Sequence, residues 1–198
     1  MTQVVFLNGP PRSGKDTVVR FLVPYLDFRH LKFAAPLKRG AAGFLDISAS
    51  TLEHWKEKRP SAFLRNGSIM EYDSVREHLI EYFVWLSYRY GDDILGRLLW
   101  QDVRTGAKEL CIVSDSGKGN EVAYVVRQVG RGNCIIIRIH RKGCTFEGDN
   151  REYLPDTLCK SFDLHNDNTH EQLAAFALRI IARELGVTPI KEAHWAPT

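Results

Sequence analysis

The residues that most constrain this chain lie near its start, where a glycine-containing loop separates a strand pattern from a helix pattern. The loop reads GPPRSGKDT over residues 9–17. Residues 3–8 (QVVFLN) are apolar and β-branched, as in a buried parallel strand, and residues 15–26 carry apolar side chains at helical spacing. Strand, loop and helix together predict a phosphate-binding loop whose backbone N–H groups face a polyphosphate. A glycine-containing turn without a ligand is the alternative.

Five positions of this loop have individual roles. Gly9 and Gly14 permit the backbone angles that wrapping around phosphates needs. Lys15 is expected to be a solvent-facing charge that reaches the β- and γ-phosphates. Asp16 stands where a hydroxyl residue is usual, so we expect it to help hold a hydrated Mg²⁺, with Thr17 supplying a hydroxyl to a phosphate one residue later. A helix N-terminal acid is the alternative for Asp16.

Strand and helix patterns alternate along the rest of the chain. Further strand patterns lie at residues 29–35, 109–115, 133–140 and 161–167, with helical patterns between them at 36–46, 74–91, 92–104 and 120–130 and a last one at 169–186. This alternation predicts an α/β fold with a doubly wound, five-stranded parallel sheet that binds ligands at the carboxyl ends of its strands. A chain of 198 residues with 44% hydrophobic residues can bury one core, so we expect a single domain, 1–198.

Three features are expected near that carboxyl edge. Asp115 ends an apolar strand pattern, which is the context of an aspartate that holds Mg²⁺ or its waters; a turn residue is the alternative. Residues 138–156 (RIHRKGCTFEGDNREYLPD) gather basic side chains around two glycines, as in the closing lid of a phosphoryl-transfer enzyme. A solvated basic loop or a nucleic-acid contact is the alternative there. The polar stretch 48–70 predicts a mobile segment over a cleft.

Composition limits the partners and the compartment. A net charge of +3 is too small to argue for nucleic acid, but it suits a pocket for anionic substrates. The four cysteines form no C-x-x-C pair and read as reduced packing residues, not as a disulfide frame or a zinc site. No apolar run approaches membrane-spanning length, and the chain enters its first strand at once. We therefore expect a cytoplasmic protein without a membrane partner.

Several segments, in order, carry a resemblance to a family: GPPRSGKDT, KFAAPLK, SVREHLIEY, YGDDILGRLL, IVSDSGKGNE, IRIHRKGCTFEGDNREY and FDLHNDN. With them the chain resembles the bacteriophage-type deoxynucleoside monophosphate kinases of the P-loop NMP kinase superfamily. The resemblance implies a sheet of P-loop kinase type with a mobile acceptor-binding region at 34–75 and a short lid at 140–158. It implies Mg²⁺-dependent transfer of the ATP γ-phosphoryl group to a deoxynucleoside monophosphate for viral DNA synthesis, in the host cell cytoplasm.

The resemblance also implies roles for individual residues. The donor phosphates would be bound by Gly9, Arg12, Ser13, Gly14, Lys15, Asp16 and Thr17. The acceptor would face Lys38 and Arg76, the metal would be held by Asp16 and Asp115, and catalysis would rest on Lys15 and the lid residues Arg138, Arg141 and Arg151. Where some branches of the family have an arginine after the metal aspartate, this chain reads Ser116, Gly117 and Lys118, with Lys118 as the expected substitute. Backbone atoms of Asn166 and Asp167 are expected at the adenine edge.

Other functions stay open at this point. A P-loop kinase for another small acceptor would share every donor-side feature and differ only between residues 34 and 104. A non-catalytic nucleotide-binding regulatory module would keep the loop as a scaffold, but it would not need lid arginines. For Arg76 and Lys38, the alternative is that they are ordinary surface cations. The expected partners are ATP and a deoxynucleoside monophosphate rather than nucleic acid, and a homodimer is left open.

Overall fold

One sheet forms the centre of the protein. The computed structural model describes residues 1–55, 63–65, 68–70 and 74–191. The sheet has the strand order β2-β5-β1-β6-β7 and contains β1 (Gln3–Asn8), β2 (Arg29–Leu31), β5 (Leu110–Ser116), β6 (Cys134–His140) and β7 (Lys160–His165). Every neighbouring pair of these strands is parallel. The five-stranded parallel sheet of an α/β protein is therefore confirmed.

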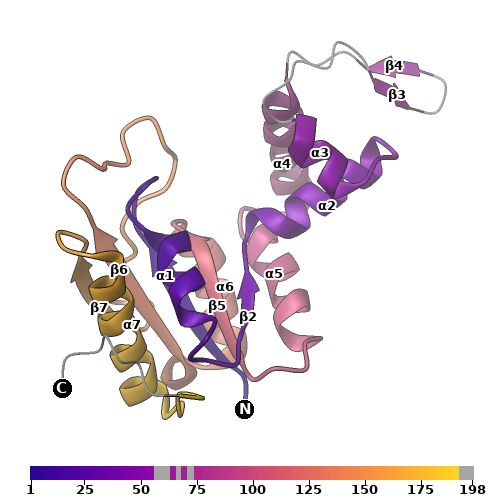
Figure 1. Ribbon diagram of the computed structural model, residues 1–198. Coiled ribbons are helices and arrows are strands. Elements are labelled where there is room, and N and C mark those ends of the chain that lie inside the picture. The colour runs from indigo at the N-terminus through magenta and orange to yellow at the C-terminus, as the bar shows by residue number, and fades with distance from the viewer. Residues whose placement is uncertain (56–62, 66–67, 71–73, 192–198) are drawn as a thin grey trace.

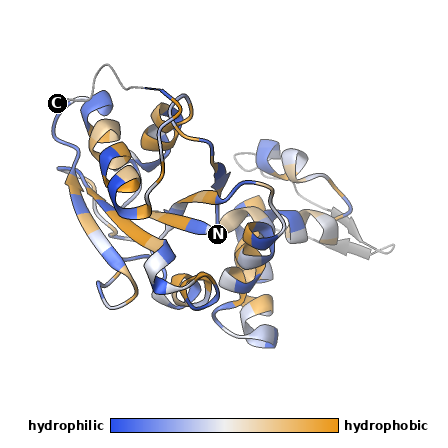
Figure 2. Cartoon of the chain, turned by 90° about the horizontal axis from the view of Figure 1, so that it is seen from below, coloured by the Kyte–Doolittle hydropathy of each residue, from blue (hydrophilic) through white to orange (hydrophobic). Residues whose placement is uncertain are grey.

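Helices cover both faces of this sheet, as the side chains of β1 show. Val5 and Leu7 pack in one core cluster with residues of α1 (Lys15–Leu22) and α7 (His170–Leu185). Val4 and Phe6 point the other way, into a cluster with α5 (Ile94–Arg104) and α6 (Gly119–Val129). Successive strand side chains alternate between faces, so a strand buried on both sides must be apolar throughout. Figure 2 shows these hydrophobic strands between the two helical layers.

The strand order brings the candidate loop to the centre of the sheet edge. β1 lies between β5 and β6, and the chain leaves β1 toward β2 on one side but reaches β6 on the other. In open parallel sheets, such a reversal leaves a crevice outside the carboxyl ends of the strands. The loop that follows β1 lies at this crevice, with the ends of β5 and β6 on either side of it.

A group of helices extends beyond the sheet on the β2 side (Figure 1). It consists of α2 (Ala34–Phe44), α3 (Ala49–Trp55) and α4 (Val75–Tyr90), with a hairpin of β3 (Phe63–Arg65) and β4 (Ser68–Met70). These helices have a small core of their own, made by Ala41, Ala42, Leu45, Leu52 and Val75. The sequence predicted only an irregular, mobile segment at 48–70. Part of that stretch, and of the acceptor-binding region expected at 34–75, lies outside the described residues.

α2 begins earlier than the sequence predicted. The helix starts at Ala34, not at Pro36, and β2 is correspondingly shorter than the predicted strand 29–35. The cause is Asp115, whose two carboxylate oxygens accept the backbone N–H groups of Phe33 at 2.8 Å and Ala34 at 3.0 Å. A carboxylate at the first turn satisfies N–H groups that the helix itself cannot. This contact joins the end of β5 to the start of α2.

The structure also bears on two expectations drawn from composition, namely the state of the cysteines and the lack of a membrane-spanning segment. All four cysteines are unpaired, and Cys111, Cys134 and Cys159 are buried. Among the helices that the structure describes, none is long and apolar enough to cross a membrane.

The close approach of α5 and α6 generates a prediction for stability. A Cβ atom at Gly96 would lie 2.4 Å from the Glu121 carbonyl oxygen of α6. Gly96→Ala is expected to lower the free energy of unfolding by about 1–3 kcal/mol, because the helices must separate. Urea-induced unfolding measures this change.

The matched control is Gly43→Ala in α2, where no described atom lies within 4 Å of the added Cβ. Alanine is the better helix former, so this variant is expected to gain up to about 1 kcal/mol. Equal destabilisation of the two variants would contradict the role given to helix packing at Gly96.

Candidate active site

The loop between β1 and α1 is built on two glycines. Gly9 has φ 155°, and a Cβ there would lie 2.5 Å from the carbonyl oxygen of Ile139 on β6. Gly14 has φ 114°, and its Cβ would lie 2.7 Å from Nδ2 of Asn166. α1 begins directly after Gly14, and no side chain caps its N-terminus. Its first N–H groups therefore have no side-chain acceptor, which leaves them available to an anion.

Lys15 is buried, although the sequence predicted a solvent-facing charge. Its Nζ donates hydrogen bonds to the carbonyl oxygens of Gly9 at 2.6 Å and Pro10 at 2.7 Å. Burial, and to a smaller extent the charge of Arg151, lowers the pKa of Lys15 to about 8, although Asp16 and Asp115 oppose the shift. The loop thus folds around its own lysine and holds the ammonium next to the backbone that would meet a phosphate.

Asp16 lies at the mouth of the loop beside the end of β5. Its Oδ1 pairs with Nζ of Lys32 at 2.8 Å and accepts a hydrogen bond from Oγ of Ser114 at 3.0 Å. Partial burial would raise the pKa of Asp16, but the hydrogen bonds from Lys32 and Ser114 outweigh it and keep that pKa below its usual value. The Asp16 carboxylate therefore stays ionised at neutral pH.

The oxygen donors here suit Mg²⁺. This ion prefers hard oxygen ligands and is usually held by one or two carboxylates together with substrate phosphates and waters. Asp16 offers such a carboxylate next to the phosphate loop. Asp115 is occupied at the start of α2, and its burial raises its pKa although Phe33, Ala34 and nearby cations work against the rise. Within the described ranges, no group of three or more His, Cys, Asp or Glu side chains could hold a metal by itself.

A first cavity opens over the phosphate loop. This loop cavity has a volume of about 310 Å³ and is lined by Arg12, Gly14, Lys15, Asp16, Thr17, Arg141 and His170. Arg141 reaches it from the connection between β6 and β7, for which the sequence predicts a lid, and its Nη1 donates a hydrogen bond to the carbonyl oxygen of Arg12 at 3.0 Å. Five of the expected donor-side residues and one lid arginine therefore line one cavity.

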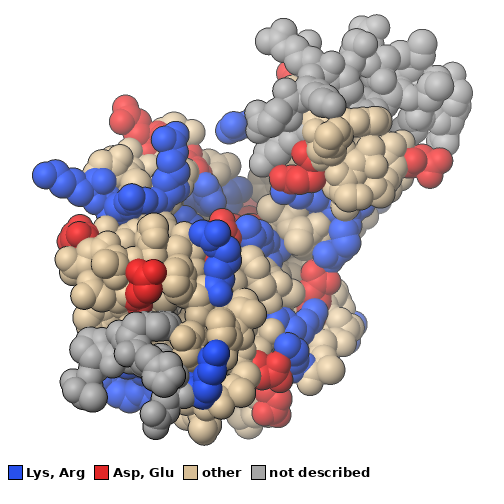
Figure 3. Space-filling view, in the orientation of Figure 1, with Lys and Arg blue, Asp and Glu red and all other residues tan. Residues whose placement is uncertain are grey.

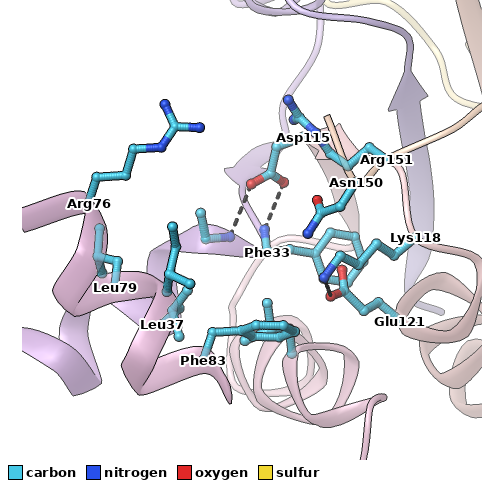
Figure 4. A pocket seen from close by; sticks show the side chains of 13 residues that line it. Phe33, Leu37, Arg76, Leu79, Phe83, Asp115, Lys118, Glu121, Asn150 and Arg151 are labelled. Atoms are coloured by element: carbon cyan, nitrogen blue, oxygen red, sulfur yellow. Dashed lines mark hydrogen bonds and ion pairs between the residues drawn. The ribbon is translucent and has the colours of Figure 1, made fainter. Parts of the chain in front are cut away.

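A second cavity lies between the sheet edge and α4 (Figure 4). This α4 cavity has a volume of about 290 Å³. Its apolar wall is made by Phe33, Leu37, Leu79, Ile80, Phe83 and Leu95, and its polar groups belong to Arg76, Asp115, Lys118, Glu121, Asn150 and Arg151. An apolar wall with a few convergent polar groups is typical of small-molecule sites. Arg76 and Lys118, predicted to contact an acceptor, both line it.

Lys38 and Arg138 do not line either cavity. Lys38 pairs with Glu53 on α3 at 2.5 Å. Arg138 is enclosed by acids: its Nη2 lies 2.8 Å from carboxylate oxygens of both Asp156 and Asp163. Its Nη1 donates to the carbonyl oxygen of Leu154 at 3.0 Å. Arg138 thus joins the end of the lid to β6 and β7, and its guanidinium is already engaged.

Arg151 belongs to the α4 cavity rather than to the loop cavity. A Cβ at Gly117 would lie 2.6 Å from Cβ of Arg151, so the missing side chain at Gly117 makes room for this arginine. Asp149 orients the guanidinium from the other side, with Nε to Oδ1 at 2.9 Å and Nη2 to Oδ2 at 2.5 Å. The two lid arginines therefore serve different cavities.

Charge connects the two cavities. Lys15 lines the loop cavity, yet its pKa responds to Arg151 and Asp115 of the α4 cavity. Charges shift a pKa in this way when they lie close together. Figure 3 shows Lys and Arg side chains on both sides of the hollow between the lid and the α2–α4 group. An anion in either cavity would meet positive charge.

Two buried asparagines brace the loop, and the sequence analysis missed the first. Asn8 donates from Nδ2 to the carbonyl oxygens of Ser116 and Glu152, each at 2.9 Å, and its Oδ1 accepts the N–H of Leu154 at 2.9 Å. Asn166 was expected to meet adenine through its backbone. Its backbone N–H instead donates to the His140 carbonyl oxygen at 2.7 Å, and its Nδ2 donates to that of Ser13 at 2.8 Å.

Only one sequence signal indicates such bracing, namely an amide residue at the end of a strand pattern, at Asn8 and again at Asn166. Buried amides are costly unless they are hydrogen-bonded, so a buried asparagine at a strand end indicates a local network. Asp167, which follows Asn166, is exposed and lines neither cavity.

Comparison with known proteins adds little. No family model matches the sequence, and no curated protein matches it either. An unliganded sugar kinase from Janibacter sp. HTCC2649 superimposes on it with a TM-score of 0.43 and 14% sequence identity, and the match covers 95% of this chain and 99% of that chain. A similarity at this level carries no argument about fold or activity.

The network of Asn8 generates a second prediction. Asn8→Ala removes three hydrogen bonds, two of them buried and one partly buried, from two carbonyl oxygens and one N–H group. The free energy of unfolding is expected to fall by about 2–4 kcal/mol, measured by urea unfolding.

Asn133→Ala is the control, because Asn133 makes one side-chain bond, to the Val129 carbonyl oxygen at 3.1 Å, at a partly exposed helix end. The free energy of unfolding of this variant is expected to fall by about 1 kcal/mol or less. An Asn8→Ala variant as stable as this control would refute the bracing role.

Proposed function

We propose that this protein transfers the γ-phosphoryl group of ATP to a deoxynucleoside monophosphate, with Mg²⁺, and releases the two diphosphates. The observation that carries the proposal is a pair of cavities: one is lined by Lys15, and the other is lined by Arg151 and Asp115, whose charges shift the pKa of Lys15. One is formed by the phosphate loop and suits a polyphosphate donor. The other combines an apolar wall with Arg76, Lys118 and Arg151 and suits an acceptor with an anionic group and an apolar ring.

In the proposed reaction an oxygen of the acceptor phosphate attacks the γ-phosphorus of ATP. A new P–O bond forms there while the bond to the β-phosphate oxygen breaks, so that ADP leaves with that electron pair. Lys15 and the α1 N-terminus bind the donor phosphates, and Arg141 stabilises the charge on the transferring group. Arg76 and Arg151 orient the acceptor phosphate for in-line attack.

When bound, Mg²⁺ would neutralise and orient the donor phosphates. Asp16 would contribute the carboxylate that retains it, and Ser114 and Lys32 hold that carboxylate in place. Asp115 acts on the acceptor side by fixing the first turn of α2, which supplies Phe33 and Leu37 to the cavity wall.

The acceptor and the viral role rest on the sequence resemblance. The anion-binding residues of the α4 cavity favour a phosphorylated acceptor over an uncharged one such as a nucleoside. A non-catalytic nucleotide-binding module would have no need of a second cavity lined by cations beside the phosphate loop. These alternatives are separated by an ADP-release assay with ATP, Mg²⁺ and a panel of nucleoside monophosphates, nucleosides and other small phosphorylated and unphosphorylated metabolites.

Turnover with one or more deoxynucleoside monophosphates is the expected result of that assay. ADP release with nucleosides or other metabolites alone would favour a kinase for another acceptor. ATP binding without ADP release for any acceptor would favour the regulatory module.

Arg141 provides a third prediction. Arg141→Ala is expected to lower kcat at least about a hundredfold, because arginines that stabilise the transferring phosphoryl group contribute this much or more. The affinity for a non-hydrolysable ATP analogue, measured by calorimetry, is expected to change less than kcat.

Lys142→Ala is the matched control, since Lys142 is the next cation of the lid, is exposed and lines neither cavity. Its kcat is expected to stay within about twofold of wild type. If Arg141→Ala weakens nucleotide binding but keeps kcat within about threefold, Arg141 only attracts anions, and no catalytic lid exists.

The lowered pKa of Lys15 provides a fourth prediction. Polyphosphate binding favours the charged ammonium of Lys15. In the free protein this ammonium loses its proton as the pH rises through about 8. Above that pH, binding must take up a proton, so the affinity for an ATP analogue is expected to fall by up to about tenfold per pH unit. Calorimetric titrations between pH 7 and pH 9.5 measure the slope.

Lys15→Met is the comparison, because it keeps a side chain of similar length without the titrating group. The variant is expected to bind more weakly at pH 7 and to show no such slope. A slope that persists in Lys15→Met would assign the proton to another group.

A further inference from the structure

Glu121 has no place in the proposed reaction, and its burial is unusual. It lies in the first turn of α6 and lines the α4 cavity, with only 4% of its surface exposed. Its Oε1 is buried and has no hydrogen-bond partner among the described residues. The nearest cation, Nζ of Lys118, lies 3.9 Å away, which is too far for a hydrogen bond.

Stability does not explain a carboxylate in this position. An acid in the first turn of a helix gains from the helix dipole, but an exposed acid would gain it without desolvation. Burial raises the pKa of Glu121 to about 7, although Lys118 and Arg151 work against the shift. Burial therefore costs this carboxylate more than its charged neighbours return. A buried polar group without a partner in the free protein is a candidate for contact with a ligand.

The surroundings of Glu121 show what such a ligand would meet. Figure 4 shows Lys118 and Glu121 side by side at the α4 cavity, next to the Phe83 ring. Nζ of Lys118 lies 4.1 Å from the centroid of that ring. This part of the cavity thus offers an apolar face, one hydrogen-bond acceptor and one donor. It can recognise a flat or sugar-like polar edge, whereas Arg76 and Arg151 suit a phosphate.

We propose that Glu121 is a specificity-determining residue: its carboxylate accepts a hydrogen bond from an N–H or O–H group of the acceptor nucleoside. The inference rests on the proposed function, which makes the α4 cavity the acceptor site. Two parts of a nucleotide carry such donors, namely the edge of the base and the 3′-hydroxyl of the sugar. A site that hydrogen-bonds a donor discriminates strongly against an analogue without it, because its own buried group is then left unpaired.

The test compares wild type with Glu121→Met, which keeps the length of the side chain and removes its acceptors. Four deoxynucleoside monophosphates are assayed, together with a 3′-deoxy analogue and an analogue whose purine has no N–H donor on its edge. Glu121→Met is expected to lower kcat/KM for the best natural acceptor at least about tenfold, which is about 1.4 kcal/mol. Glu121→Gln keeps an acceptor oxygen and is expected to recover part of the loss.

The analogues identify the source of the donor. If the sugar supplies the donor, wild type has a low kcat/KM for the 3′-deoxy analogue, and Glu121→Met does not lower that kcat/KM further. If the base supplies it, the same holds for the purine analogue, and differences among the four natural bases shrink in Glu121→Met. Thermal unfolding is expected to show Glu121→Met to be at least as stable as wild type at pH 8, since a buried carboxylate oxygen without a hydrogen bond is removed.

Two results would overturn the inference while leaving the kinase function standing. One is an unchanged kcat/KM in Glu121→Met for every acceptor. The other is an equal loss for all acceptors, including both analogues, which would mean a structural role. If wild type transfers no phosphate, the proposed function fails, and the same comparison of Kd values by calorimetry decides the role of Glu121 separately. Absence of both transfer and monophosphate binding would overturn both proposals.

Discussion

The hydrogen bonds of one buried side chain hold the candidate site together. Asn8 is the last residue of β1, and its amide joins the end of β5 at Ser116 to the lid residues Glu152 and Leu154. Two of the segments that line the cavities start from these ends: the phosphate loop follows β1, and Lys118 and Glu121 follow β5. The lid returns past Arg151 directly into the Asn8 network. Because buried amide hydrogen bonds are directional and costly to leave unmade, they fix these three segments relative to one another.

The fold was predictable from the sequence because its signals are local. Apolar runs such as Val4 to Leu7 are long enough to be strands buried on both faces, and the glycine spacing after them needs no knowledge of distant residues. The failures concern contacts between distant segments. The acids that enclose Arg138 come from positions 156 and 163, and the early start of α2 depends on Asp115, far along the chain. Nothing in the local pattern showed that Lys15 folds back onto its own loop.

Lys15, Asp115 and Glu121 share a physical property: burial shifts the pKa of each toward its neutral form. Such shifts mean that the free protein holds charges at a cost, and they cluster at functional sites more than elsewhere. The charges are of both signs and lie along the two cavities, so no single simple anion would compensate all of them. A polyphosphate beside Lys15 and a ligand with a hydrogen-bond donor beside Glu121 would do so together. The cost of burying these charges lowers the stability of the free protein. Ligands that compensate the charges recover this free energy, which favours the complex with both ligands.

The clamp at Arg138 limits how the lid connection can move. Arg138 binds Asp163 on β7 and both Asp156 and the Leu154 carbonyl oxygen, so residues 154–156 are tied to the sheet. Arg151 lies close to this fixed end. Its guanidinium pairs with Asp149, and its side chain packs against Gly117, where a Cβ would collide with it. It is therefore placed before any ligand arrives. The glycines with positive φ, Gly143 and Gly148, lie between Arg141 and Arg151, which confines easy backbone change to that stretch. Arg141, on the other side of that stretch, directly follows β6 and is bonded to the Arg12 carbonyl oxygen of the phosphate loop. The two arginines are therefore held by different partners, one at each cavity, and the stretch between them can change its backbone without displacing either.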